Sequence, residues 1–357
     1  MKTKNIDVDI TIKKIVFLIG CLCLVSIIVF DILNSDTYNL KEGWPNFSVP
    51  YIIRSIIIFI SIIALFWGLV GHHRPKLVIS ENNGVSLERV GILMVIFISV
   101  IILLIFIFDP TTFNAISKED NIIEWTSSIL LFGSCFITTF SFLNNYHVLK
   151  DSKLIRLSLA LLSFAFFIMA MEEVSWFQRV LQIETPKLFE SNGQHEMNLH
   201  NFATNYIENL YYFGAFVFLV VFPFIRFLFP SITNNNYLKT FVPRPFIGVI
   251  CSIACAYNFD MWNIIFTQIS FYGSLIILCV FTIFSSVRNE RYIILFTILL
   301  ITTSQILFLV NGINFDRLWE ITEYKEFLIA LALFIYSWDV FFHIKKPLVS
   351  SINTADY

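Results

Sequence analysis

The chain has 357 residues, of which 57% are apolar and only 14% are charged, and its mean hydropathy is +0.75. Typical soluble domains carry about 25% charged residues, so this composition excludes a water-soluble globular protein. The formal net charge of −2 gives no indication of a nucleic-acid partner, and the lipid bilayer is the partner that the composition predicts.

Ten apolar runs are candidate membrane spans, because a hydrocarbon core about 30 Å thick needs about 20 apolar residues in a helix. They are predicted at residues 15–33, 50–70, 90–108, 121–143, 155–172, 206–229, 245–259, 264–286, 292–311 and 325–343. The seventh run is short, so it is expected to tilt little or to form a tight hairpin with the eighth. The prediction is an all-α polytopic transmembrane bundle, a single integral membrane domain over residues 1–357.

The basic residues predict the orientation of this bundle. Most Lys and Arg side chains fall in segments on the same side as the N-terminus, and cytoplasmic loops carry such an excess. The first apolar run follows a basic segment, as in a signal peptide, but the residues after it contain no small-residue cleavage site. We therefore expect a retained first span and an integral membrane protein with both termini in the cytoplasm.

The longest polar segment covers residues 173–205, on the outer side between the fifth and sixth spans. It begins at the pair Glu172-Glu173, and ionisable groups at membrane depth are unfavourable by about 2.5–3.5 kcal/mol. If the fifth helix continues through this segment, Glu172, Trp176 and Arg179 share one face, and Arg179 is expected to pair on that face. The alternative interpretation is an ordinary helix end that reaches the membrane interface.

The same segment contains the run QHEMNLHN at residues 194–201. In a helix, Glu196 and His200 would stack on one face because they are four residues apart. Together with His195 they are candidate ligands for a divalent metal such as zinc or manganese, or a general acid–base set. A solvated loop is the alternative interpretation.

Two further acidic runs precede or enter predicted spans from the outer side, and the first covers residues 119–125. Glu119 and Asp120 are well placed to cap a helix N-terminus and to meet its dipole. Glu124 lies about one turn further along, so capping does not explain it. We expect its side chain to point into the protein or into a polar cavity.

The second acidic run precedes the tenth span, and its members Glu320, Glu323 and Glu326 are three residues apart. In a helix they form one acidic stripe. The alternating topology places all four acidic groups at the outer ends of spans, so the bundle could bring them around one outward-facing cavity. Asp260, in the outer turn between the seventh and eighth spans, could join them.

The runs EEVSWFQR at 172–179, ETP at 184–186 and QHEMNLHN at 194–201 resemble the pattern E-E-x-S-W-x-Q-R … T-P … Q-x-E-x-N-L-H-N of a group of bacterial multi-pass membrane proteins. An earlier E-D-x-x-x-E run of that group is similar to residues 119–124. The group has no assigned activity, so the resemblance implies shared importance of these residues but no reaction. CAAX-type intramembrane proteases carry E-E-x-x-x-R instead, and Phe177 stands at that Arg position here.

Three functions are compatible with these features: a cell-envelope enzyme with an outward-facing Glu/His site for a lipid-linked or lipid-like substrate, an ion- or proton-coupled transporter, and a non-catalytic scaffold. The last includes proteins of the polysaccharide polymerase or flippase type, which are similar in composition. For the enzyme, the candidate catalytic residues are Glu124, Glu172, Glu173, Arg179, Glu196 and His200, and the candidate substrate-binding residues are Trp176, Gln178, Asn198 and Asn201. Arg179 would hold an anionic headgroup. The one cofactor considered is a divalent metal, with His195, Glu196 and His200 as its candidate ligands.

Overall fold

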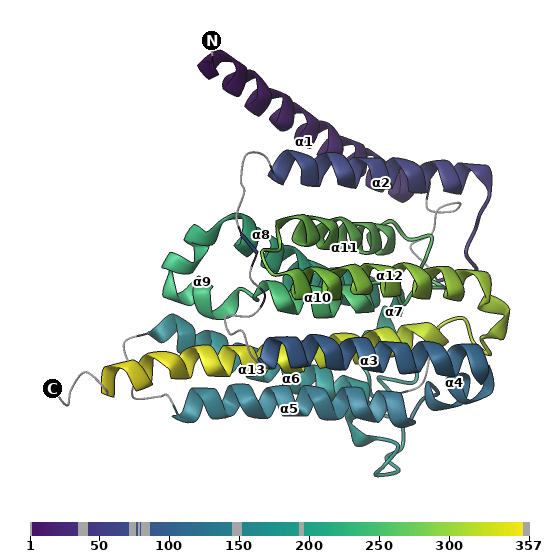
Figure 1. Cartoon of the computed structure of the whole chain (residues 1–357). Helices are drawn as coiled ribbons and strands as arrows, with labels where there is room; N and C mark the ends of the chain where they lie inside the picture. The colour runs from purple at the N-terminus through teal and green to yellow at the C-terminus, as the bar shows by residue number, and fades with distance from the viewer. Residues whose placement is uncertain are drawn as a thin grey trace.

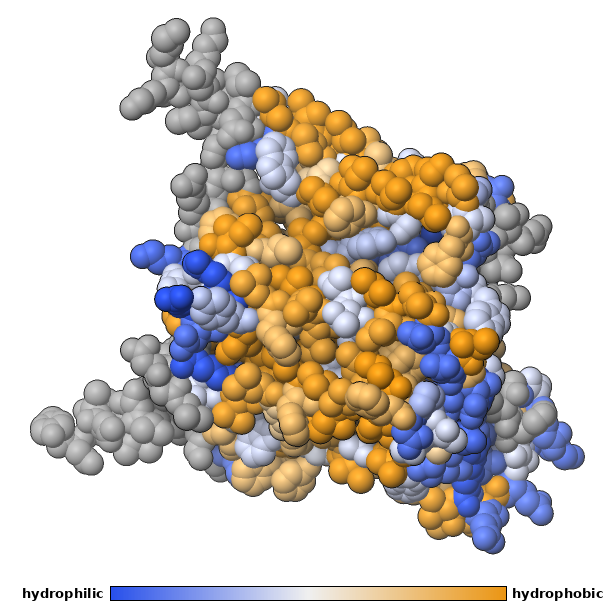
Figure 2. Space-filling view, turned by 45° about the vertical axis from the view of Figure 1, so that its right-hand side comes forward, coloured by the Kyte–Doolittle hydropathy of each residue, from blue (hydrophilic) through white to orange (hydrophobic). Residues whose placement is uncertain are grey.

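The computed structural model describes residues 2–34, 42–70, 76–77, 79, 86–144, 152–192 and 196–352. Within these ranges the chain is helical, and an isolated parallel bridge between Leu77 and Ser285 is the one strand-like pairing. Long helices run roughly parallel to one another across the molecule (Figure 1). A broad apolar band lies between two more polar rims on the face shown in Figure 2.

Nine helical segments in the described part of the chain are long and apolar enough to cross a bilayer. They are α1 (Lys2–Leu33), α2 (Val49–Val70), α3 (Leu87–Phe108), α5 (Ile122–Asn144), α6 (Lys153–Glu173), the continuous run of α7 (Thr204–Phe216), the π-helical turn Val217–Val221 and α8 (Phe222–Leu228), then α11 (Ile265–Phe284), α12 (Arg288–Val310) and α13 (Glu320–Ile352). These helices confirm the predicted all-α polytopic bundle. Two shorter helices, α4 (Pro110–Ile116) and α9 (Asn236–Phe241), lie between spans.

The predicted seventh span, 245–259, is wrong as a full helix. Helix α10 (Pro245–Ala254) has only 10 residues, which is about 15 Å of helix, and the chain continues to α11 through turns and bends. Backbone groups that leave a helix inside a membrane protein need internal partners. Asn258 Nδ2 donates to the Cys255 carbonyl (2.6 Å), and Gln305 Nε2 of α12 donates to the Asn258 carbonyl (2.7 Å). This buried segment replaces the second half of the expected span.

The bundle has two polar ends, between which the spans alternate in direction. We call the end that carries residues 42–48, 109–121, 174–203 and 311–319 the site face, and the end that carries residues 229–244 and 285–287 the opposite face. Helix α1 begins, and α13 ends, on the opposite face (Figure 1).

Close packing between spans relies on small residues, as expected where lipid provides no hydrophobic drive for helices to associate. In α5, which packs against both α6 and α13, Ser128 Oγ donates to the Ala170 carbonyl of α6 (3.0 Å). Helices α1 and α2 also approach closely, because a Cβ at Gly20 would lie 2.8 Å from the Ser61 carbonyl oxygen. This approach leaves no room for a side chain there.

A buried ion pair joins α1 to α2. Asp31, whose exposed fraction is 2%, accepts hydrogen bonds from Nε (3.1 Å) and Nη2 of Arg54. The remaining terminal nitrogen of Arg54 donates to the Asn263 carbonyl (3.0 Å), just before α11. The pair therefore also fastens the two peripheral helices to the centre of the bundle.

Candidate functional site

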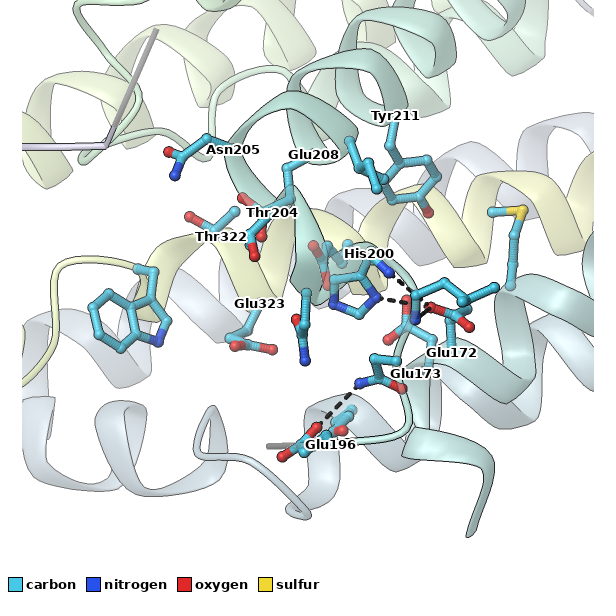
Figure 3. Close-up of a pocket in the computed structure, with 18 of the residues that line it drawn as sticks. Glu172, Glu173, Glu196, His200, Thr204, Asn205, Glu208, Tyr211, Thr322 and Glu323 are labelled. Atoms are coloured by element: carbon cyan, nitrogen blue, oxygen red, sulfur yellow. Dashed lines mark hydrogen bonds and ion pairs between the residues drawn. The ribbon is translucent and has the colours of Figure 1, made fainter. Parts of the chain in front are cut away.

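A cavity of about 560 Å³ opens on the site face among α5, α6, α7 and α13 (Figure 3). Its walls carry nine glutamates together with His200, two tyrosines, three asparagines of the polar segment and a few apolar side chains. The lining residues used below are Glu42, Glu119, Glu124, Ile168, Met169, Glu172, Glu173, Glu196, Asn198, Leu199, His200, Asn201, Ile207, Glu208, Tyr211, Tyr212, Trp319, Thr322, Glu323 and Glu326. Members of all four predicted acidic groups therefore meet in space, as the topology suggested.

Glu172 and His200 form a hydrogen-bonded pair in the cavity wall. One carboxylate oxygen of Glu172, Oε2, lies 3.2 Å from His200 Nδ1 and accepts from the backbone N–H groups of Leu199 (2.8 Å) and His200 (3.2 Å). The other oxygen accepts from Trp176 Nε1 (2.7 Å). Four donors thus fix this carboxylate at the end of α6, and the carboxylate in turn fixes the imidazole ring (Figure 3).

Four carboxylates from three helices, Glu124 of α5, Glu173 of α6, and Glu323 and Glu326 of α13, form what we call the glutamate group. The carboxylate of Glu173 experiences the charges of the other three. Tyr212 Oη donates to Glu326, and the backbone N–H of Asp120 donates to Glu124. Figure 3 shows Glu173 and Glu323 pointing toward the same space. Like charges that share a site repel one another, so this arrangement needs protons or an external cation.

Arg179 holds the polar segment to the start of α5. Its guanidinium donates to Asp120 (2.5 Å), to Glu119 (3.0 Å) and to the buried carboxylate of Glu196. Partial burial would lower the pKa of Arg179, but hydrogen bonds and charge from Asp120 and Glu119 outweigh it and raise that pKa. Arg179 is therefore a permanent cation with three carboxylate partners, and the predicted role in holding an anionic headgroup is not supported by its position.

Glu196 is the centre of a hydrogen-bonded network that shapes the polar segment. Besides Arg179, its carboxylate accepts from Ser175 Oγ (2.6 Å) and Asn198 Nδ2 (3.1 Å). Its backbone N–H donates to Asn192 (3.2 Å), whose own amide donates to the Glu196 carbonyl (2.6 Å). These bonds make Glu196 a structural residue that also contributes to the cavity wall.

The fifth helix does not continue through residues 172–179, which was the condition for Glu172, Trp176 and Arg179 to share one face. Helix α6 ends at Glu173, and Ser175, Trp176 and Phe177 follow with φ values of 46°, 55° and 58°. Left-handed conformations are unfavourable by roughly 1–2 kcal/mol for each such residue. The turn redirects the chain, so Arg179 leaves the face of Glu172 and reaches Glu119, Asp120 and Glu196 instead, while Trp176 still contacts Glu172.

This left-handed turn gives a stability prediction at Phe177. We expect Phe177→Gly to be more stable than Phe177→Ala by about 1 kcal/mol, because only glycine occupies positive φ without strain. Both variants lose the ring contacts with Trp125 and Phe132, so the difference isolates the backbone. Equilibrium unfolding in mixed micelles would measure this difference in stability. A Phe177→Ala variant as stable as Phe177→Gly, or more stable, would contradict the left-handed geometry.

Three further site predictions need correction. Residues 196–199 form bends rather than a helix, so Glu196 and His200 do not stack and have different partners. Gln178 does not line the cavity, since its side chain bonds Thr185 Oγ1 (3.0 Å) and the Met197 N–H (2.6 Å). Trp176 is likewise outside the lining, behind Glu172. Asn198 and Asn201 do line it, and their substrate-binding role stays a prediction.

The metal candidates are not brought together. His195 lies outside the described residues, while Glu196 and His200 have separate partners in Arg179 and Glu172. Among the residues that the structure describes, no three His, Cys, Asp or Glu side chains are arranged to hold a metal ion. Asp260 lies beside the cavity, where Thr322 Oγ1 donates to it (3.1 Å).

Several lining residues were not predicted from the sequence: Glu42, Glu208, Tyr211, Tyr212, Trp319 and Thr322. Glu208 did carry a signal, because it is a carboxylate inside the predicted span 206–229, where ionisable groups are rare. Glu42 carried no such signal in the sequence, since acidic residues in loops are common. The aromatic residues look like ordinary interfacial anchors in the sequence.

Comparison with protein-family models, with curated proteins and with solved structures finds no match to this chain.

Proposed function

We propose that this chain is an integral membrane enzyme that uses Glu172, His200 and Glu173 as acid–base groups on a lipid-linked or lipid-like substrate. The observation that carries the proposal is the Glu172–His200 pair in the wall of the cavity. A carboxylate that binds one ring nitrogen sets the tautomer and orientation of an imidazole. The second ring nitrogen then exchanges a proton with the substrate.

The position of the pair supports a substrate from the membrane. Ile168 and Met169 lie one helical turn below Glu172 and Glu173 on α6, and both line the cavity. Leu199 and Ile207 add apolar surface at its edge and are well exposed. A cavity with carboxylates near the membrane interface and apolar side chains deeper fits a molecule with a polar head and a hydrocarbon tail.

His200 provides the direct test. Proteoliposomes made from bacterial polar lipids would be followed by mass spectrometry for a lipid that the wild-type protein converts. We expect His200→Ala to slow conversion by about 10²–10⁴-fold, the usual contribution of a general acid or base, and added imidazole to restore part of the rate.

The matched control is His343→Ala on the opposite face, where His343 contacts Asp339. This variant should convert lipid at the wild-type rate. Equal rates in His200→Ala and wild type, or no conversion of any lipid by the wild-type protein, would overturn the proposed activity.

The orientation belongs to the same proposal. We infer that the site face looks out of the cytoplasm of a bacterial cell and that both termini are cytoplasmic, because most of the 24 Lys and Arg residues precede, follow or connect spans on the opposite face. The group of bacterial membrane proteins that the polar segment resembles would then share this outward-facing site.

A proton- or ion-coupled carrier is the second candidate function, and the glutamate group is the observation that favours it. Its members belong to three membrane-spanning helices, and carboxylates in such places serve proton relays in pumps and transporters. Solute flux without any covalent product, in the same proteoliposomes, would favour the carrier over the enzyme.

A further inference from the structure

We infer that the ligand of this cavity carries a protonated primary amine. The inference rests on the proposed function for its site but names the chemical group that the site recognises. Charge is unevenly distributed around the cavity. No Lys or Arg is among the described residues that line the cavity, whereas nine glutamates are.

The nearby arginines do not neutralise most of these carboxylates. Arg179 and Arg317 form ion pairs with Glu119, and Arg179 also with Glu196. Glu172 forms an ion pair with His200. Within the described part of the chain, the other glutamates of the wall form no ion pair. The carboxylates without an ion pair are Glu42, Glu124, Glu173, Glu208, Glu323 and Glu326. The charge of the buried Lys325 ammonium acts on two of them, Glu208 and Glu326. A cation between them relieves their mutual repulsion.

Independent evidence comes from polar atoms without partners. Asn198 has an exposed fraction of 4% and lines the cavity, yet its Oδ1 has no hydrogen-bond partner among the described residues. Its amide nitrogen is already used, because Nδ2 donates to Ser175 (3.0 Å) and Glu196 (3.1 Å). Tyr211 Oη, also in the wall, is buried without a partner there too. Since Oδ1 only accepts, the missing partner is a hydrogen-bond donor.

An ammonium satisfies these groups better than a metal ion or an anion would. It donates three hydrogen bonds, which suits a wall of carboxylate and amide oxygens, and no three-ligand metal arrangement occurs among the described residues. The protein itself shows the fit next to the cavity. The buried Lys325 ammonium donates to Asn258 Oδ1 (2.6 Å) and lies 4.4 Å from the ring centre of Tyr212, a cavity residue.

The amine could belong to a lipid headgroup or to a free amine, and two probes separate these sources. Putrescine would be titrated calorimetrically into the purified full-length protein, with 1,4-butanediol and succinate as neutral and anionic molecules of the same length. Phosphatidylethanolamine would be tested by native mass spectrometry of protein in nanodiscs, against phosphatidylglycerol alone. We expect at least one amine to bind, with an affinity that falls as salt is added.

The variants identify the site. Glu323→Gln/Glu326→Gln should weaken amine binding by about tenfold or more, as expected when partners of a charged ligand are neutralised. Glu184→Gln, an exposed carboxylate of the same polar segment outside the cavity, should leave binding unchanged. The single variant Glu323→Gln, with an intermediate loss, serves if the double variant does not fold.

Binding of the amine by wild type and by Glu184→Gln, but not by the double variant, supports the inference. Equal binding of butanediol or succinate, or no binding of either amine, overturns it. The outcome is separable from that of the proposed enzyme. His200-dependent lipid conversion without amine binding would remove only the substrate class, whereas amine binding without conversion would leave a binding site and remove the enzyme.

Discussion

Replacing Arg54 by methionine is expected to destabilise the bundle by about 3–5 kcal/mol, the usual effect of removing one partner of a buried ion pair. The variant leaves Asp31 charged with an exposed fraction of only 2%, and it removes the donor to the Asn263 carbonyl. Both losses act where α1 and α2 join the rest of the molecule. Equilibrium unfolding in mixed micelles, followed by circular dichroism, would measure the change.

The double variant Asp31→Leu/Arg54→Met is the matched control. A buried pair replaced by apolar side chains is often neutral or stabilising, so we expect the double variant to lie within about 1–2 kcal/mol of wild type and well above the single variant. A double variant that is as unstable as the sum of the two single variants would show that the pair has no special coupling. That result would contradict the claim that the Asp31–Arg54 ion pair holds α1 to α2.

The fold was largely predictable because hydrocarbon thickness imposes long apolar runs, which are visible in sequence. The exception at 245–259 has a physical reason. A run of apolar residues looks the same whether it is helical or in turns, and the partners that permit the turns, such as Gln305, lie far away in the chain. The location of the acidic groups on one face was predictable too, since the spans alternate in direction, but their meeting in one cavity depends on helix order.

The pairing within the site was not predictable. Three successive residues with positive φ, Ser175 to Phe177, carry no glycine that would mark the turn. The sequence therefore left both a continued helix and a helix end open, and it did not indicate the partners that Arg179 has in the fold. The order of helices in the bundle was also unreadable, which hid the approach of Glu208 on α7 to Glu42 in the cavity wall.

A functional effect as large as that at His200 is expected at Glu173. We expect Glu173→Gln to lower the rate of lipid conversion by about 10²–10⁴-fold, because glutamine cannot transfer a proton. The Glu173→Gln protein should nevertheless fold. The substitution removes a carboxylate that faces Glu124, Glu323 and Glu326, and relief of like-charge repulsion leaves stability unchanged or raises it by about 0.5–2 kcal/mol, as in other cases where function and stability conflict.

Glu290→Gln is the contrasting variant, because Glu290 is a fully buried glutamate that has partners. It lies 3.6 Å from Arg89 Nη2 and accepts from the Ile79 N–H (3.0 Å) near the opposite face. We expect this variant to lose stability but, once folded, to convert lipid at the wild-type rate. The two carboxylates thus differ because Glu290 has a basic partner within the protein, while the charged groups that act on Glu173 are other carboxylates. A Glu173→Gln protein that is unstable but active would reverse this assignment and make Glu173 a structural residue.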